Sequence, residues 1–213
     1  GAGPDTGRRG IGSAGEALPP RTPPGYLGKE NGAVMFELDH IAVSAGTLAE
    51  GVAHVEAALG VALGAAVGVH DHMATHNRLL GLGPRDYLEV IAIDPGRAAP
   101  DHPRWFRLDR FRGAPRLTNW ICRVPDLTAA LAAAPAGSGR PVDLARGDFR
   151  WRMAVPDDGC LPFDDCCPAL IEWRGPRPSD RLADAGCRLT RLEVAHPEAG
   201  ALERLLPLAD PRV

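Results

Sequence analysis

From residue 36 onward, hydrophobic and polar positions repeat with periods that predict a strand followed by a helix. Residues 36–44 alternate between apolar and polar side chains, as a strand with one buried face does. Residues 47–59 carry apolar side chains at helical spacing, and Gly60 stands where a helix commonly ends in the left-handed conformation. Three further apolar runs predict strands, at 61–69, 76–82 and 87–93. The stretch 36–93, which we call module one, therefore predicts the order β-α-β-β-β.

A second stretch repeats this order, which predicts an internal duplication. After a loop over 94–116, residues 117–124 predict a strand, and Asp126 can cap a helix over 127–134. Three more strands are expected at 141–144, 149–155 and 169–173. We call the stretch 117–173 module two.

Both ends of the chain depart from this repeat. Residues 1–34 hold Gly, Pro, Arg and Ser with hardly any apolar neighbours, a composition that cannot offset the entropy of ordering. We therefore expect residues 1–34 to be a disordered extension and residues 35–213 to form the folded domain. At the other end, a strand at 188–196 and a helix at 198–206 predict a partial third module within 187–208. The predicted fold class is α+β, with paired βαβββ modules that form curved mixed sheets and an appended β-α element.

Composition and charge narrow the class of protein. The chain has 213 residues, of which 45% are hydrophobic and 24% charged, enough for an ordinary core. Its formal net charge of -3 offers no basic field for nucleic acid, and no apolar run is long enough to cross a bilayer. The odd number of cysteines, 5, and the lack of a secretory segment favour the cytoplasm. We expect no nucleic-acid or membrane partner.

His40 and Glu89 are the first candidates for chemistry. His40 lies near the middle of the opening strand of module one, and Glu89 lies at the same depth of its closing strand. If these strands are neighbours, an imidazole and a carboxylate converge, and both are ligands for Mn, Fe, Co, Ni or Zn. The alternative is that His40 is a core histidine with its hydrogen bonds made inside the protein, and that Glu89 is a carboxylate on an edge strand.

Five short motifs, in this order along the chain, resemble the vicinal oxygen chelate superfamily, in its glyoxalase-like domain branch. The motifs are Leu38-Asp-His-Ile-Ala-Val, His70-Asp-His-Met-Ala-Thr-His-Asn-Arg-Leu-Leu, Tyr87-Leu-Glu-Val-Ile-Ala-Ile-Asp-Pro, Phe149-Arg-Trp-Arg, and Leu161-Pro-Phe through Leu170-Ile-Glu-Trp. The resemblance implies two modules whose sheets close around a shared cavity. It also implies metal ligands, where a metal is kept, on the first and fourth strands of each module.

Carried over by position, the resemblance implies His40, Glu89 and Glu172 as metal ligands. Module two departs from the family pattern, because Trp120 stands where its first-strand ligand would be and an indole nitrogen only donates. Glu172 is offset by one residue relative to Glu89, and a slip of one residue turns a side chain to the other face of its strand. The site therefore has three protein ligands at most.

Further residues are candidates for catalysis and substrate binding. His70 and Asn77 match the family residues that line the cavity mouth, and His70 or Glu172 could act as the proton-transfer base. Arg150 and Arg152 share one face of a strand and could hold an anionic group of a substrate. Trp105, Phe106 and Trp120 could form an apolar wall. The alternatives are solvated loop histidines, a solvated arginine face and ordinary core aromatics.

The leading hypothesis is a metal-dependent enzyme that stabilises an oxyanion or enolate of a small, oxygen-rich substrate. Lyase, isomerase and dioxygenase chemistry all fit it. The rival hypothesis is a metal-free protein of the same fold that binds or sequesters a small molecule, and a scaffold module is a third. A small-molecule ligand is the expected partner, and a homodimer is left open.

Overall fold

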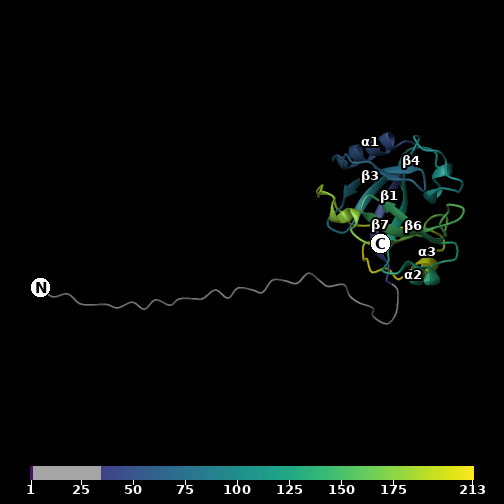
Figure 1. Ribbon diagram of the computed structural model, residues 1–213. Coiled ribbons are helices and arrows are strands. Elements are labelled where there is room, and N and C mark those ends of the chain that lie inside the picture. The colour runs from purple at the N-terminus through teal and green to yellow at the C-terminus, as the bar shows by residue number, and fades with distance from the viewer. Residues whose placement is uncertain (2–34) are drawn as a thin grey trace. The chain divides into compact units, whose positions relative to one another are not determined.

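The eight predicted strands of the two modules form one curved sheet in the computed structural model, which describes Gly1 and residues 35–213 (Figure 1). The strands of module one are β1 (Glu37–Ser44), β2 (Gly68–His70), β3 (Thr75–Gly81) and β4 (Tyr87–Ile93). The strands of module two are β5 (Arg116–Arg123), β6 (Arg140–Arg146), β7 (Phe149–Val155) and β8 (Ala169–Trp173). The expectation for residues 1–34 lies outside the described residues, apart from Gly1.

The order of the strands follows the predicted duplication. Across the sheet it is β2-β3-β4-β1-β5-β8-β7-β6, so each module contributes four adjacent strands. In each module the opening strand runs parallel to the closing strand, β1 beside β4 and β5 beside β8. The two modules join through the antiparallel pair β1 and β5. The sheet curves nearly into a barrel, and the predicted α+β class with paired βαβββ modules is confirmed.

Each module also carries the predicted helix after its first strand. Helix α1 (Leu48–Leu59) begins where the Thr47 hydroxyl accepts a hydrogen bond from the Glu50 amide, and it ends at Gly60 with φ 68°. Helix α2 (Leu127–Ala133) is capped by the Asp126 carboxylate, which accepts from the backbone amides of Thr128 and Ala129. Both caps come from residue types that favour this position, so local sequence determines where the helices begin.

The C-terminal segment differs from the prediction. The helix expected at 198–206 is α3 (Ala199–Leu205), but no strand forms over 188–196. The two edges of the sheet are β2 and β6, and 188–196 pairs with neither of them. Its backbone instead contacts the end of the chain, where the Leu192 amide donates to the Arg212 carbonyl at 2.7 Å. The partial third module is therefore a helix preceded by irregular backbone.

Strand β2 is also shorter than predicted. It spans only Gly68–His70 instead of 61–69, because the stretch before it includes Gly64 and a run of small, mostly exposed residues. Small side chains leave little to pack against a neighbouring strand. Gly64 still donates a backbone hydrogen bond to the Leu79 carbonyl, but the regular ladder begins only at Gly68.

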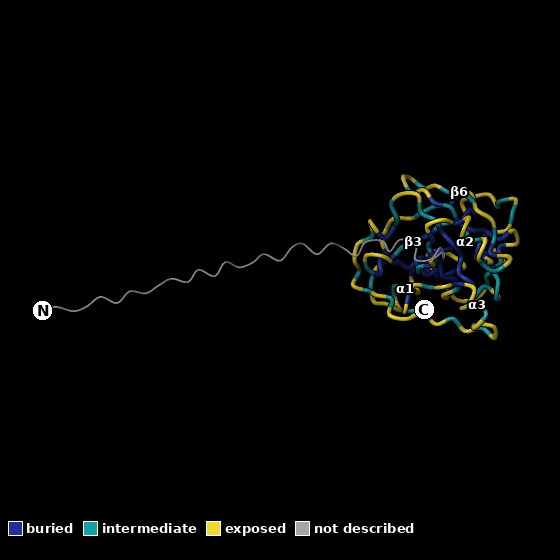
Figure 2. The backbone as a smooth tube through the Cα atoms, turned by 90° about the horizontal axis from the view of Figure 1, so that it is seen from below, coloured by how far each residue is buried: buried dark blue, intermediate teal, exposed yellow. Residues whose placement is uncertain are grey.

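The chain end closes over the opening strand. The Phe36 amide donates to the Pro207 carbonyl at 3.3 Å, and the Ala209 amide donates to the Phe36 carbonyl at 3.0 Å. Phe36 is fully buried, and buried backbone gathers at the centre of the domain while exposed backbone lies around it (Figure 2). The segment after α3 thus belongs to the same core as β1. None of the helices in the described part of the chain has the length and apolar character needed to cross a membrane.

Candidate functional site

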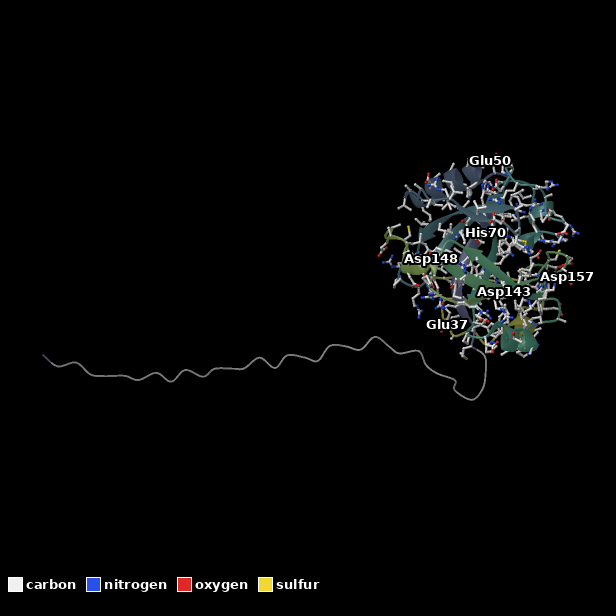
Figure 3. The ribbon with its side chains drawn as sticks, in the orientation of Figure 1. Glu37, Glu50, His70, Asp143, Asp148 and Asp157 are labelled. Carbon is white, nitrogen blue, oxygen red and sulfur yellow. The ribbon has the colours of Figure 1, made fainter. Side chains whose placement is uncertain are left out.

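A pocket on the concave side of the sheet is lined by both modules; about 30 Å³ of it is open to a water-sized sphere, within about 400 Å³ of space that includes the solvent at its mouth. Module one contributes side chains from β1, β2, β3 and β4, and module two contributes side chains from β6, β7 and β8. His70, which lines the cavity, lies well inside the outline of the domain, whereas Glu50 and Asp157 lie at its rim (Figure 3). The resemblance implied a shared cavity, and the structure places one between the modules.

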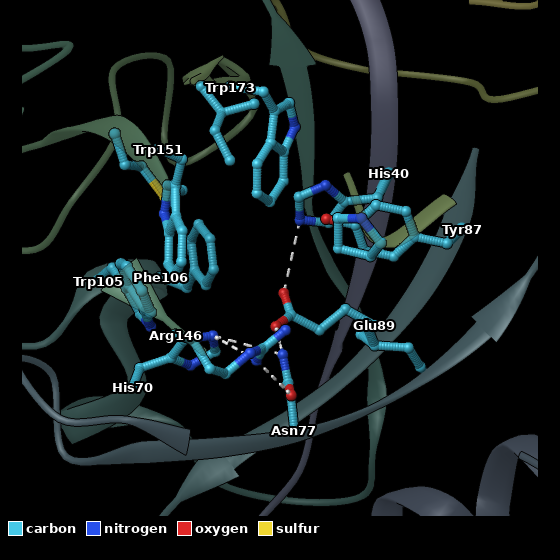
Figure 4. Close-up of a pocket in the computed structure, with 14 residues that line it drawn as sticks. His40, His70, Asn77, Tyr87, Glu89, Trp105, Phe106, Arg146, Trp151 and Trp173 are labelled. Atoms are coloured by element: carbon cyan, nitrogen blue, oxygen red, sulfur yellow. Dashed lines mark hydrogen bonds and ion pairs between the residues drawn. The ribbon is translucent and has the colours of Figure 1, made fainter. Parts of the chain in front are cut away.

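His40 and Glu89 converge on this cavity, as their positions on the two strands predict. The His40 Nε2 atom lies 3.6 Å from the Glu89 Oε2 atom, and both side chains are buried (Figure 4). The His40 ring stacks on the Tyr87 ring with centroids 4.3 Å apart and planes inclined by 13°. Its Nδ1 donates to the Asp39 carboxylate at 2.8 Å. The imidazole is therefore held between two carboxylates and cannot rotate freely.

This arrangement favours the charged form of both groups. Burial alone would lower the pKa of His40, but hydrogen bonds to Asp39 and Glu89 outweigh burial and raise that pKa to about 9. Burial would raise the pKa of Glu89, but the His40 imidazolium next to it lowers that pKa to about 2. At neutral pH the pair is therefore an imidazolium and a carboxylate, with one proton to donate and one group able to accept.

His70 and Asn77 complete the polar side of the cavity. The Asn77 amide nitrogen donates to Glu89 Oε1 at 2.5 Å, so both oxygens of that carboxylate have partners. His70 Nδ1 lies 3.0 Å from the Thr75 hydroxyl, and His70 Nε2 lies 3.4 Å from donor nitrogens of Asn77 and Arg146. With donors on its Nε2 side, the neutral ring carries its proton on Nδ1. Burial lowers the pKa of His70 to about 4, so the ring is neutral at pH 7.

Arg146 is the functional candidate that sequence reasoning missed. It is the last residue of β6, and its Nη1 atom donates to Asn77 Oδ1 at 3.1 Å across the gap between the two sheet edges. The strand predicted from the sequence ends at Leu144 and does not include Arg146. A usable signal was present, because Arg146 continues the alternation of the half-buried residues Val142 and Leu144.

Aromatic rings form the rest of the wall. Trp151 on β7 and Trp173 on β8 are paired residues whose ring centroids lie 5.6 Å apart. Trp105 and Phe106, from the 3₁₀ segment η1 (Trp105–Arg110), line the cavity as expected, and Phe106 adopts a left-handed φ of 57°. Trp120 does not line it, since its buried indole nitrogen donates to the Cys166 carbonyl at 2.9 Å. The interpretation of Trp120 as a cavity residue is therefore corrected.

Glu172 does not join His40 and Glu89. Its carboxylate accepts from the Leu127 amide at 2.8 Å, at the start of α2, and from Arg174 Nε at 2.9 Å. Its neighbours on β8, Ile171 and Trp173, line the cavity instead. Successive side chains of a strand point to opposite faces, so Glu172 faces the helix. The interpretation of Glu172 as a metal ligand or catalytic base is corrected on this ground.

Arg150 and Arg152 also lie outside the cavity. They share one face of β7, as predicted, but Trp151 between them is the residue that faces the cavity. Arg152 Nη1 lies 3.4 Å from the Thr128 hydroxyl oxygen and 3.4 Å from the Glu172 carboxylate, beside α2. Arg150 is exposed and donates to the Gly147 carbonyl at 2.6 Å. Neither side chain can hold a ligand in this cavity, so both predictions are corrected.

The donor set does not fit a resident divalent ion. His40 and Glu89 could contact one ion, but Glu172 faces away and His70 Nε2 already faces two hydrogen-bond donors. Among the residues that the structure describes, no three His, Cys, Asp or Glu side chains are grouped as a metal site requires. Catalytic metals usually have three protein ligands. The Arg146 guanidinium, on the same cavity wall, adds positive charge.

Because His70 is neutral in the folded protein, the free energy of unfolding depends on pH. Its folded pKa of about 4 is below the ordinary value of 6.5, so the unfolded chain takes up a proton between these values that the folded chain does not. Stability is then lost as the pH falls below 6.5, by about 2 kcal/mol from this residue at pH 5. We expect urea unfolding of His70→Gln to lose correspondingly less stability between pH 7 and pH 5 than the wild type. Equal losses in the two proteins would contradict a buried neutral His70.

Comparison with known proteins gives one family match and several distant structural likenesses. A family model described as a glyoxalase-like domain matches residues 38–208. No protein in the curated set matches the chain. A hypothetical protein from Staphylococcus aureus is similar at 14% identity and a TM-score of 0.47, over 67% of this chain and 60% of its own.

Two methylmalonyl-CoA epimerases are among the other similar structures. The enzyme from Mycobacterium tuberculosis has 20% identity and a TM-score of 0.42, over 66% of this chain and 88% of its own. The enzyme from Streptomyces coelicolor, in complex with 2-nitronate-propionyl-CoA, has 14% identity and a TM-score of 0.43, over 66% and 97%. At these identities the likeness concerns the fold alone.

Proposed function

The chain belongs to the glyoxalase-like domain family, and from this we propose that it is an enzyme that moves a proton on a small organic molecule bound in the cavity. The observation that carries the proposal is the Glu89 carboxylate, buried on the cavity wall with the His40 imidazolium beside it. Buried, charged acid and base groups are concentrated at functional sites. Isomerase and lyase chemistry both begin with such a proton transfer.

The pair supplies the two groups that this chemistry needs. Glu89 would take a proton from the carbon next to a carbonyl, and the C–H electron pair would form the C=C bond of an enol or enolate. His40 Nε2 lies 3.6 Å from Glu89 Oε2, and with the ligand oxygen between them it would donate to the carbonyl oxygen as charge develops on it. Return of the proton to either face of the carbon, or loss of a group next to it, completes the reaction.

Ligand binding would also change the basicity of Glu89. Its low pKa comes from the His40 imidazolium and Asn77, which offset the effect of burial. A ligand oxygen placed between Glu89 and His40 would weaken the ion pair, while the aromatic walls keep water out. Burial then raises the pKa of the carboxylate and makes it a better base.

The same chemistry with a metal ion, which the family resemblance implied, is not supported by the donors of this cavity. His40 and Glu89 are two donors where three are usual.

A second candidate function is sequestration of a small molecule without turnover. The observation in its favour is the aromatic lining, since rings on several strands can enclose an apolar ligand. In that case the ion pair of His40 and Glu89 would serve to orient the ligand. The two candidates predict different fates for the bound molecule.

Exchange of carbon-bound hydrogen with solvent separates the two functions. We expect the wild type, in D₂O, to catalyse deuterium uptake next to the carbonyl of at least one compound in a panel of small ketones, esters, thioesters and carboxylates. Glu89→Gln keeps the shape but removes the base, and should slow this exchange by at least ~100-fold. The readout is proton NMR of the compound.

Two further variants serve as controls for the Glu89→Gln result. Glu89→Asp keeps the charge and should retain measurable exchange, and the exposed Glu203→Gln should behave as the wild type. Binding of panel compounds without any exchange would favour sequestration. Full exchange activity in a folded Glu89→Gln would contradict the role of Glu89.

A further inference from the structure

We propose that the ligand of this cavity carries a carboxylate group and that Arg146 binds it, an inference that deepens the proposed function by naming the class of substrate. The guanidinium of Arg146 is on the cavity wall, in the same polar cluster as Glu89, His40, His70 and Asn77 (Figure 4). A carboxylate at this position would lie beside the groups that transfer the proton.

The charge of Arg146 has no carboxylate partner in the described part of the chain. Both of its hydrogen bonds in the cavity use Nη1, to Asn77 Oδ1 at 3.1 Å and to His70 Nε2 at 3.4 Å. These acceptors are neutral, and no Asp or Glu of the described residues forms an ion pair with Arg146. A planar guanidinium with further donors free is suited to a carboxylate, which it can bind through two parallel hydrogen bonds.

Asn77 keeps this charge apart from Glu89. Its amide nitrogen donates to Glu89 Oε1, and its amide oxygen accepts from Arg146, so the side chain lies between the two charges. Glu89 meanwhile has His40 as its charged partner. The side chains that line the cavity therefore include one ion pair and one additional cation, while Asp39, behind His40, has Arg123 3.8 Å away as a further partner. A ligand that brings one negative charge would neutralise that cation.

The path of Arg146 into the cavity depends on the absence of a side chain at Gly68. Gly68 pairs with Asn77 between β2 and β3. A Cβ atom at Gly68 would come within 2.0 Å of Arg146 Nη1 and 2.2 Å of Asn77 Oδ1. The glycine thus provides the space through which an arginine of module two reaches the polar cluster of module one. An arginine that only interacts with solvent would not require a glycine at this position.

The cavity wall includes another donor group besides the remaining N–H groups of Arg146. The indole nitrogen of Trp105 is buried without a hydrogen-bond partner in the described part of the chain. The Trp105 ring lies against His70, edge to face, with centroids 5.0 Å apart. Buried donors are normally satisfied, so an unpartnered one in a cavity wall is a place for a ligand acceptor. Carboxylate oxygens only accept, and they fit a cavity with donors in excess.

Pairs of ligands that differ only in charge test the proposal. We would measure binding of phenylacetate and benzoate, each beside its neutral amide, to the wild type by calorimetry. We expect each carboxylate to bind at least about 10-fold more tightly than its amide, the scale of a hydrogen bond to a charged group. Benzylphosphonate, tested beside them, distinguishes a carboxylate site from a site for larger anions. Tighter binding of the phosphonate would overturn the carboxylate assignment.

Three variants show which residues cause the preference for a carboxylate over its amide. Arg146→Gln should abolish the preference for the acid over the amide, and Gly68→Ala should reduce it without changing any charge, because it displaces the guanidinium. Arg146→Lys keeps the charge and should retain part of it. Arg150→Gln is the matched control, since Arg150 is exposed on the neighbouring strand, and it should leave both affinities unchanged. Thermal unfolding establishes that each variant is folded before binding is compared.

The outcomes separate this inference from the proposed function. Equal binding of acid and amide, or a preference that survives in Arg146→Gln, overturns the inference alone. Selective binding of carboxylates without deuterium exchange of any panel compound supports the inference and overturns the proton-transfer function. Failure of the wild type to bind any of these acids and amides overturns the inference, while deuterium exchange of other compounds would still support the function.

Discussion

Replacing His40 with glutamine is expected to lower the free energy of unfolding by about 4 kcal/mol, because it leaves two buried carboxylates without the cation between them. Asp39 and Glu89 lie on either side of the imidazole and are both buried. Arg123, whose Nη1 atom is 3.8 Å from Asp39, can compensate only one of them. Loss of the stacking contact with Tyr87 adds to the effect. Urea unfolding at pH 7 measures the loss.

A second substitution shows whether the loss comes from the ion pair. If it does, adding Glu89→Gln to His40→Gln removes one of the two unpaired charges. The double variant should then be more stable than the sum of the two single effects predicts, by at least ~1 kcal/mol. Additive losses, within about 0.5 kcal/mol, would mean that His40 and Glu89 do not interact in the folded protein.

Separating the two modules is expected to abolish folding of module one. Strand β1, its opening strand, pairs with β5 of module two along its whole length, from Glu37 opposite Arg123 to Ser44 opposite Arg116. Phe36 also exchanges backbone hydrogen bonds with Pro207 and Ala209, which lie beyond module two. A fragment of residues 35–96 would expose β1 as an open edge and uncover the buried face beneath it. Such a fragment loses core contacts that its local structure cannot replace.

The measurement is the dispersion of amide signals in a proton–nitrogen NMR spectrum of the fragment. We expect collapsed or broadened signals for residues 35–96 alone, and a dispersed spectrum when residues 97–213 are co-expressed with it. A dispersed spectrum and cooperative unfolding of residues 35–96 alone would show that module one has an independent core.

Local sequence determined the helices and most of the strands, and it determined how far along their strands His40 and Glu89 lie. The short apolar run after the turn at residues 83–86 predicted β4 with the observed bounds, Tyr87–Ile93, because such a run is a strand signal that no tertiary contact needs to supply. Thr47 and Asp126 begin the two helices by hydrogen bonds within their own first turns. The convergence of His40 and Glu89 followed from their places on parallel neighbours, once the family resemblance had implied which strands pair.

Tertiary structure decided which side chains face the cavity. A single residue of register separates Glu172, which faces α2, from Trp173, which faces the cavity, and register is set by pairing with β5 and β7. Arg146 reaches Asn77 only because the curved sheet brings its two edges together and Gly68 leaves room there. Residues 188–196 were predicted as a strand but pair with no strand of the sheet. Periodicity along the chain indicates which residues can share a face of a strand. Which face is buried depends on the partner strands, and the space for Arg146 depends on Gly68; these are distant in sequence from the residues they affect.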